Sequence, residues 1–163
     1  TLAATKSDLQ NRVFHSNVEI ELTKSELERE MNNRARAEQA LVESESRFKV
    51  LYDNTPSMSF IVEEEGEILS VNRYGAFVLG YKRDDLVGNS IFNTYHPDDK
   101  ETLQAHLRDV MQNQSTLHHW EIRRISSKGE TIWTWETAKA ITDMLGNLSI
   151  LIVSAEIDKQ DTG

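Results

Sequence analysis

The chain has 163 residues, no cysteine and a formal net charge of −9. The absence of cysteine excludes disulfides, thiolate zinc sites and cysteinyl adducts, and it fits a reducing compartment. The acidic balance argues against nucleic-acid binding, and no apolar run approaches the roughly 18 residues that a bilayer span needs. We therefore expect a cytoplasmic chain. Because it begins with Thr1 rather than Met, we expect it to be a piece of a longer protein, which could itself be membrane-anchored, with any output activity outside this chain.

The first part of the chain is predicted to be one long helix, because all seven glycines and both prolines lie at or after Pro56. Apolar residues recur there at the seven-residue spacing of a coiled coil, with Arg34 filling one gap. The predicted seam consists of Leu9, Val13, Ile20, Leu27, Leu41, Phe48 and Leu51. The middle of this seam is polar and therefore weak, and a polar helix of this length is not stable alone in water. We expect it to pair with its own copy as a parallel homodimer, and packing on another domain is the alternative. An ordinary dimer coil and a coil that switches between two registers both remain open.

The chain changes its periodicity after Pro56, which is expected to end the helix. Short β-type runs at 58–62 and 68–71 predict a hairpin. The acidic residues between them lack the alternating ligands of a calcium loop, so a solvated turn is expected. Asn72 is predicted to cap a short helix that ends at Gly80, and a second short turn follows over 83–87.

A longer helix is predicted to start near Pro97, where a proline and acidic residues suit a first helical turn. Its buried stripe is expected to comprise Leu103, Leu107, Val110 and Met111. Three strands are then predicted at about 117–126, 130–141 and 148–157, separated by turns that contain glycine.

The order of these elements, and the glycines and prolines that separate them, resemble those of the PAS family. The residues that carry the resemblance are Glu45, Arg47, Phe48, Leu51, Asn54 and Pro56; Gly66, Ile68 and Asn72; Gly80, Tyr81, Asp85, Leu86 and Gly88; His96, Pro97 and Asp99; Glu121 and Arg123; Lys128, Gly129, Glu130 and Trp133; and Glu156, Ile157 and Asp158. The resemblance implies an α+β fold, a five-stranded antiparallel sheet with helices on one face. It divides the chain into a dimerising helix (1–44), a PAS domain (45–158) and a tail toward an output domain (159–163).

The resemblance also implies which strand residues face an internal pocket. Those candidates are His118, Trp120, Ile122, Thr134 and Glu136. Glu136 beside His118 would be costly to bury without a partner, which favours a small polar ligand. A cavity filled by Trp120 and aliphatic side chains, with the polar groups at a wet rim, is the other interpretation.

Two cofactors of the family need residues that this chain lacks at the required places. A flavin-cysteinyl adduct is excluded, because the chain has no cysteine. Haem is not favoured, since Leu103 stands where the resemblance places the axial histidine and His106, almost one turn later, is expected to face solvent. No metal site is expected, because neighbouring strand residues such as His118 and His119 point to opposite faces.

The outer sheet face and the chain exit complete the predicted sites. Trp133 and Trp135 are expected on the outer face, where the long helix or a partner subunit would cover them. Glu156 and Asp158 would mark the exit of the signal. No catalytic motif is present, so we do not expect an enzyme within this chain. The resemblance to the PAS family implies a sensory or relay module, most naturally of a histidine kinase. The alternatives are a ligand-free dimerisation scaffold and the sensor part of a diguanylate cyclase or phosphodiesterase.

Overall fold

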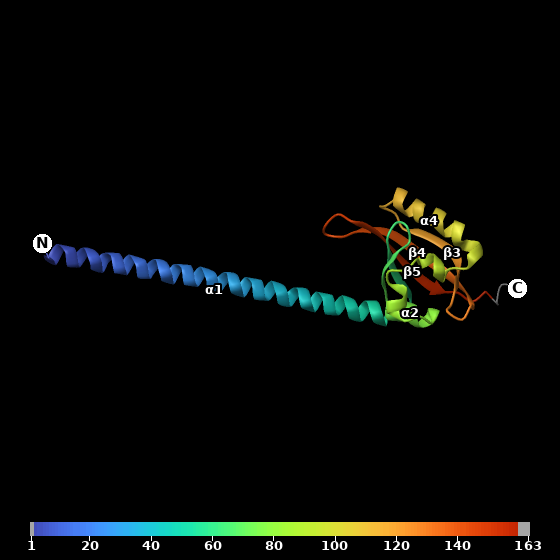
Figure 1. The fold of residues 1–163 in the computed structure, drawn as a ribbon, viewed down its shortest axis with the longest axis horizontal. Coiled ribbons are helices and arrows are strands. Elements are labelled where there is room, and N and C mark those ends of the chain that lie inside the picture. The colour runs from blue at the N-terminus through green and yellow to red at the C-terminus, as the bar shows by residue number, and fades with distance from the viewer. Residues whose placement is uncertain (1, 160–163) are drawn as a thin grey trace. The chain divides into compact units, whose positions relative to one another are not determined.

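A computed structural model describes residues 2–159, so the predicted tail lies outside the described residues except for Lys159. The chain divides into two parts, one ending at Phe48 and one beginning at Lys49. The helices are α1 (Leu2–Asn54), α2 (Arg73–Leu79), α3 (Arg83–Leu86), η1 (Ile91–Thr94), η2 (Pro97–Asp99) and α4 (Lys100–Gln112). The strands are β1 (Met58–Val62), β2 (Ile68–Val71), β3 (His118–Ile125), β4 (Thr131–Thr142) and β5 (Leu148–Glu156), and Figure 1 shows these elements.

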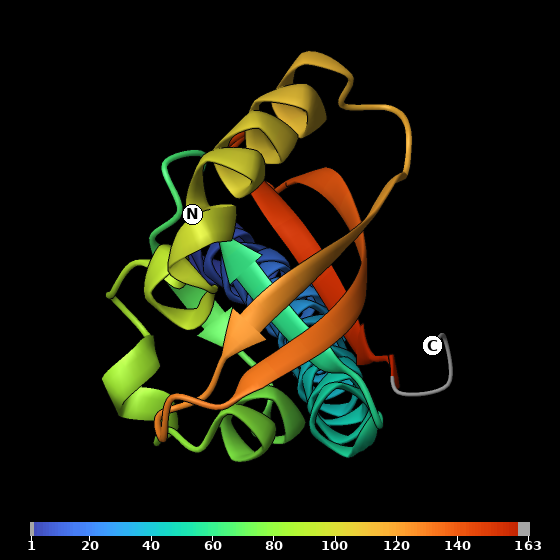
Figure 2. The same ribbon diagram turned by 90° about the vertical axis from the view of Figure 1, so that its right-hand side faces the viewer.

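The five strands form one antiparallel sheet in the order β2-β1-β5-β4-β3. The predicted α+β fold is therefore confirmed, and each predicted strand appears within one residue of its expected ends. Alternation along the strands gives the sheet a buried face, where Phe60, Ile122 and Ile152 lie, and an outer face with the exposed Trp135. In Figure 2, α4 lies against one side of this sheet, and its buried residues are Leu103, Leu107 and Val110.

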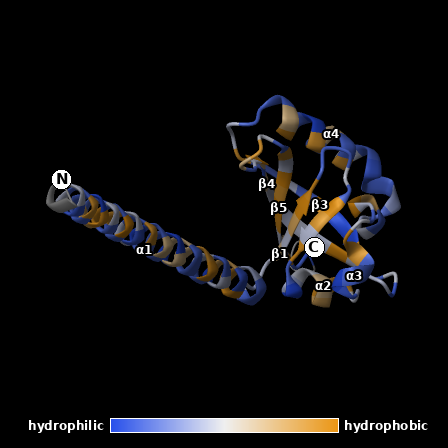
Figure 3. Ribbon diagram, turned by 60° about the vertical axis from the view of Figure 1, so that its left-hand side comes forward, coloured by the Kyte–Doolittle hydropathy of each residue, from blue (hydrophilic) through white to orange (hydrophobic). Residues whose placement is uncertain are grey.

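Helix α1 runs without a break through the long segment that lacks glycine and proline, as the composition predicts. Figure 3 shows apolar turns recurring among polar ones along it. Every predicted seam residue is exposed in the single chain, including Ile20 and Phe48 at 60% each. A helix with so many exposed apolar side chains gains stability only when something packs on it.

The last turn of α1 is bonded into the sheet part of the chain through Asn72. This residue is fully buried, and its side-chain amide donates to the carbonyl oxygens of Tyr52 (2.7 Å) and Ser57 (2.8 Å). Its side-chain oxygen accepts from the backbone N–H groups of Ser59 (2.9 Å) and Gly75 (3.0 Å), so it also caps α2 as predicted. All of its hydrogen-bonding capacity is used to hold three elements together.

Asp53 makes a second attachment in the same turn. Its buried carboxylate accepts from the backbone N–H of Arg73 at 3.0 Å and forms a salt bridge with Arg83. Tyr52 adds a hydrogen bond of 2.9 Å between its hydroxyl and that of Ser70. The end of α1 is therefore fixed to the beginning of α2, to α3 and to β2.

Candidate functional site

A cluster of polar side chains fills the core between the sheet and η1. Its centre is the ion pair between Arg124 of β3 and Glu136 of β4, with 2.9 Å between Arg124 Nε and Glu136 Oε2 and both side chains fully buried. Strand alternation places Arg124 on the same face as Ile122 and Trp120. The cross-strand register pairs Trp120 with Glu136, and the Glu136 carboxylate contacts the side chains of both Trp120 and Arg124 on β3.

Both oxygens of the Glu136 carboxylate accept hydrogen bonds. The Trp120 indole N–H donates at 2.9 Å and the Tyr95 hydroxyl at 2.8 Å, both to Oε1. The Ser154 hydroxyl contacts Oε2 beside the guanidinium of Arg124. Burial raises the pKa of Tyr95 well above its usual range, so this phenol keeps its proton and remains a donor.

Arg124 is held as completely as its partner. Besides Glu136 it donates to the hydroxyls of Thr94 (2.8 Å) and Ser154 (3.1 Å). Its guanidinium carbon lies 4.2 Å from the ring centre of Tyr95 and 4.5 Å from that of Phe60. We call Arg124, Glu136, Thr94, Tyr95, Trp120, Ser154 and Phe60 the Arg124 cluster. Among the described residues, every buried side-chain nitrogen and oxygen has a hydrogen-bond partner.

A family profile for the PAS fold matches residues 46–156, which is more than half of the chain. The chain belongs to the PAS family. The sheet order, the helices on its inner face and the motifs quoted from the sequence all agree with this assignment.

Similar proteins come from several sources. The chain is 24% identical over 120 residues to the sensor histidine kinase TmoS of Ectopseudomonas mendocina. The matched residues make up 74% of this chain but only 11% of that protein. The crystal structure of the PAS domain of an HTR-like protein from Haloarcula marismortui has 25% identity and a TM-score of 0.68, over 76% of this chain and 99% of that one. A PAS domain from Colwellia psychrerythraea, at 17% identity and a TM-score of 0.63, covers 74% and 99% and shows the fold alone.

The pocket candidates on this PAS sheet divide into two groups. Trp120, Ile122, Thr134 and Glu136 are buried in the core, whereas His118 is only partly buried at the start of β3. The hypothesis set Glu136 beside His118 without a partner from the chain, whereas each of the two side chains has partners of its own. The His118 ring instead lies 3.0 Å from the Asn113 carbonyl oxygen and 3.2 Å from the Thr116 hydroxyl. Glu136 is neutralised by Arg124, which the sequence reasoning overlooked.

His106 does not face solvent as expected, while Leu103 is fully buried in the core. The His106 ring is half-buried and stacks on Trp120, with 4.5 Å between ring centres and an angle of 3° between ring planes. Burial lowers the pKa of His106, and nearby His118 acts in the same direction, against the opposing carboxylates of Asp109 and Glu136. No group of three or more metal-binding side chains gathers among residues 2–159.

The lowered pKa of His106 predicts a pH-dependent stability. An unfolded histidine takes up a proton near pH 6.5, whereas the folded side chain resists protonation, so stability is complete above that pH and is lost as the pH falls through it. Thermal unfolding between about pH 7.5 and about pH 5.5 should show a declining Tm. His106→Phe preserves the stacked ring without the titration, so its Tm should decline less. Equal slopes for both proteins would contradict the assignment to His106.

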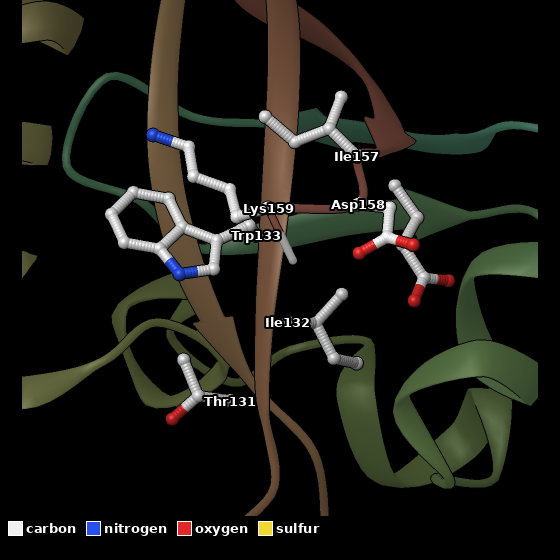
Figure 4. A pocket seen from close by; sticks show the side chains of 7 residues that line it. Thr131, Ile132, Trp133, Ile157, Asp158 and Lys159 are labelled. Atoms are coloured by element: carbon white, nitrogen blue, oxygen red, sulfur yellow. The ribbon is translucent and has the colours of Figure 1, made fainter. Parts of the chain in front are cut away.

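The two tryptophans of the outer face are partly covered by neighbouring side chains. The Lys159 ammonium lies 4.1 Å from the ring centre of Trp133, as Figure 4 illustrates, and Arg123 lies 5.5 Å from it on the other strand. The His119 ring stacks on Trp135 at 5.8 Å. Trp135 remains 44% exposed.

A pocket lies beside Trp133, where the chain leaves the end of β5. Its volume is about 690 Å³, and Figure 4 shows the side chains that line it. These are Thr131, Ile132, Trp133, Glu156, Ile157, Asp158 and Lys159. Both predicted exit residues, Glu156 and Asp158, therefore belong to its wall, and Lys159 pairs with Glu121 at 2.7 Å.

Proposed function

We propose that this chain is the sensory or relay module of a bacterial signal-transduction protein whose output is a histidine kinase. Membership of the PAS family and the similarity to the sensor kinase TmoS support this assignment. Because the chain spans about a tenth of that relative, the kinase activity belongs to another part of such a protein and this segment is not itself catalytic. The module works in the cytoplasm. None of the helices in residues 2–159 is long and apolar enough to span a bilayer.

The module works as a parallel homodimer formed through α1. A helix of 53 residues is about 80 Å long, and an isolated helix with this polar composition is unstable in water. Pairing two copies buries the exposed seam residues, whose seven-residue spacing suits a left-handed coil. The polar residues in the middle of the seam keep the stability of the coiled coil low, so a small difference in free energy is enough to change its register.

The observation that carries the relay function is the way α1 ends. Its last turn is bonded through Tyr52, Asp53 and Asn72 to β1, β2 and α2. A rotation of that turn therefore strains the domain, and a change in the domain turns the helix. The energy available is the difference in affinity or strain between two states, which is a few kcal/mol for such switches.

The proposed function is tested by measuring the autophosphorylation rate of the full-length protein that contains this chain. Arg34→Leu removes the charge from the middle of the seam and should lock the coil in one register, shifting the autophosphorylation rate away from that of the wild type. Arg36→Leu makes the same chemical change two residues later, outside the seam, and should leave the rate unchanged. Wild-type rates in both variants would refute a relay through α1.

A ligand-free role has a specific observation in its favour. The polar groups of the buried pocket candidates already have partners within the chain: Trp120 donates to Glu136, and the Thr134 hydroxyl donates to the backbone carbonyl of Ile122. No buried side-chain nitrogen or oxygen of the described residues lacks a partner. A module of this kind would transmit conformation between its neighbours rather than detect a small molecule in its core. Native mass spectrometry of the purified protein distinguishes the two, because a sensor of a small molecule would carry its ligand.

A further inference from the structure

The Arg124 cluster has the composition of a binding site for a planar cation. The ring centres of Tyr95 and Phe60 lie 4.2 and 4.5 Å from the guanidinium carbon, which is the geometry of a cation–π contact. The Glu136 carboxylate neutralises the charge at 2.9 Å, and the hydroxyls of Thr94 and Ser154 accept from the terminal nitrogens. Aromatic rings, a carboxylate and hydroxyl acceptors together are what proteins use to bind a free guanidinium compound.

The occupant of this site comes from the chain itself. Arg124 is on β3, yet its contacts come from η1, β1, β4 and β5, so its side chain fills the middle of the core rather than one wall of it. A ligand placed there would have to remove the guanidinium from three acceptors and leave Glu136 buried without its counter-charge. Such a buried, unpaired charge is strongly unfavourable.

We propose that the core of this PAS domain is a guanidinium-binding site whose permanent occupant is Arg124. The side chain stands in the place of a small-molecule ligand, and it ties the sheet to η1 as a bound ligand would. A conformational change at η1 is therefore transmitted to the sheet through Arg124, without any small molecule entering the core. The geometry of the cluster alone defines this guanidinium site, which is the same whether or not the output is a kinase.

The experiment removes the occupant and returns its head group in solution. In the full chain, Arg124→Ala keeps both aromatic rings, the carboxylate and the hydroxyls but leaves the space of the guanidinium empty. Methylguanidinium at millimolar concentration should raise the Tm of this variant in a saturable way, by about 5 °C, because it binds only the folded state. The wild type, whose site is occupied, should show no saturable rise.

Two controls separate the site from general effects of the additive. Arg123→Ala removes the neighbouring arginine, which pairs with Asp99 near the surface (2.6 Å between Nη2 and Oδ1), and it should show no saturable rise. Methylammonium has the same charge without the planar fork and should not rescue Arg124→Ala. Rescue of both arginine variants to the same extent, or by both cations, would overturn the proposal.

Arg124→Ala could be too unstable to fold alone, because it leaves Glu136 uncompensated. The variant is then refolded with methylguanidinium or with methylammonium, and circular dichroism is compared with the wild type. Recovery with methylguanidinium alone supports the proposal, whereas no recovery, or equal recovery with both, contradicts it. A small molecule found in the wild-type core by native mass spectrometry would also contradict it.

Discussion

Replacing Glu136 by alanine is expected to lower the free energy of unfolding by about 3–5 kcal/mol, because the change strands a buried guanidinium without its counter-charge. It also leaves the Trp120 N–H and the Tyr95 hydroxyl without their acceptor. Since the total stability of a domain is about 5–15 kcal/mol, this single change should bring the protein close to unfolding. Urea titration followed by tryptophan fluorescence measures the difference.

The matched control replaces both charges at once. The double variant Arg124→Met with Glu136→Leu fills nearly the same volume and leaves neither charge behind, so it should be more stable than Glu136→Ala. It should be less stable than the wild type, because the Trp120 N–H and the Tyr95 hydroxyl still lack their acceptor. The contrast isolates the cost of an unpaired buried charge from the loss of packing. A double variant as unstable as the single one would show that the lost hydrogen bonds and packing, and not charge balance, make these residues necessary.

Replacing Arg34 by leucine is expected to tighten self-association of the chain about a hundredfold. In a dimer through the predicted seam, two leucines replace two charged side chains at one layer, a gain of about 3 kcal/mol in buried apolar surface. Sedimentation equilibrium over a range of concentrations measures the dissociation constant. Arg36→Leu, a residue of the same type two positions later and outside the seam, should leave the constant within about threefold.

An equal effect of the two leucine substitutions would contradict the seam. It would indicate that general hydrophobicity, and not the position at the centre of a coil, drives association. A wild-type dissociation constant in both variants would mean that residues around Arg34 do not meet a partner helix at all.

The local elements were predictable because short-range signals determine them. Gly66, Gly80 and Gly146 take the positive φ angles that end a helix or turn a hairpin, and their places in the sequence marked the boundaries. Gly80 also lies so close to Ser127 that an added Cβ would be 2.5 Å from its hydroxyl oxygen. The helix before Pro56 followed equally from composition.

The centre of the site was only partly predictable. Alternation correctly placed Trp120, Ile122 and Glu136 on the inner face, and the same rule, extended by two residues, would have placed Arg124 there. The contact of Glu136 with Tyr95, a residue 41 positions earlier, depends on how η1 packs on the sheet, which no local pattern gives. His118 was misassigned because a residue at the first position of a strand can turn toward the preceding loop, as its contact with Asn113 shows.

The most direct measurement of the central claim, that α1 pairs in parallel with its own copy, is disulfide formation between single introduced cysteines. The natural chain has no cysteine, so each variant carries one thiol only. Under mild oxidation Ile20→Cys and Leu27→Cys, at the centre of the seam, should form crosslinked dimers rapidly, because equivalent residues meet across a parallel coil. Ser25→Cys and Asn32→Cys, on the far side of the helix, should form few or no crosslinked dimers, because their thiols point away from the partner helix. Equal crosslinking at all four positions, or none at the seam, would contradict the account.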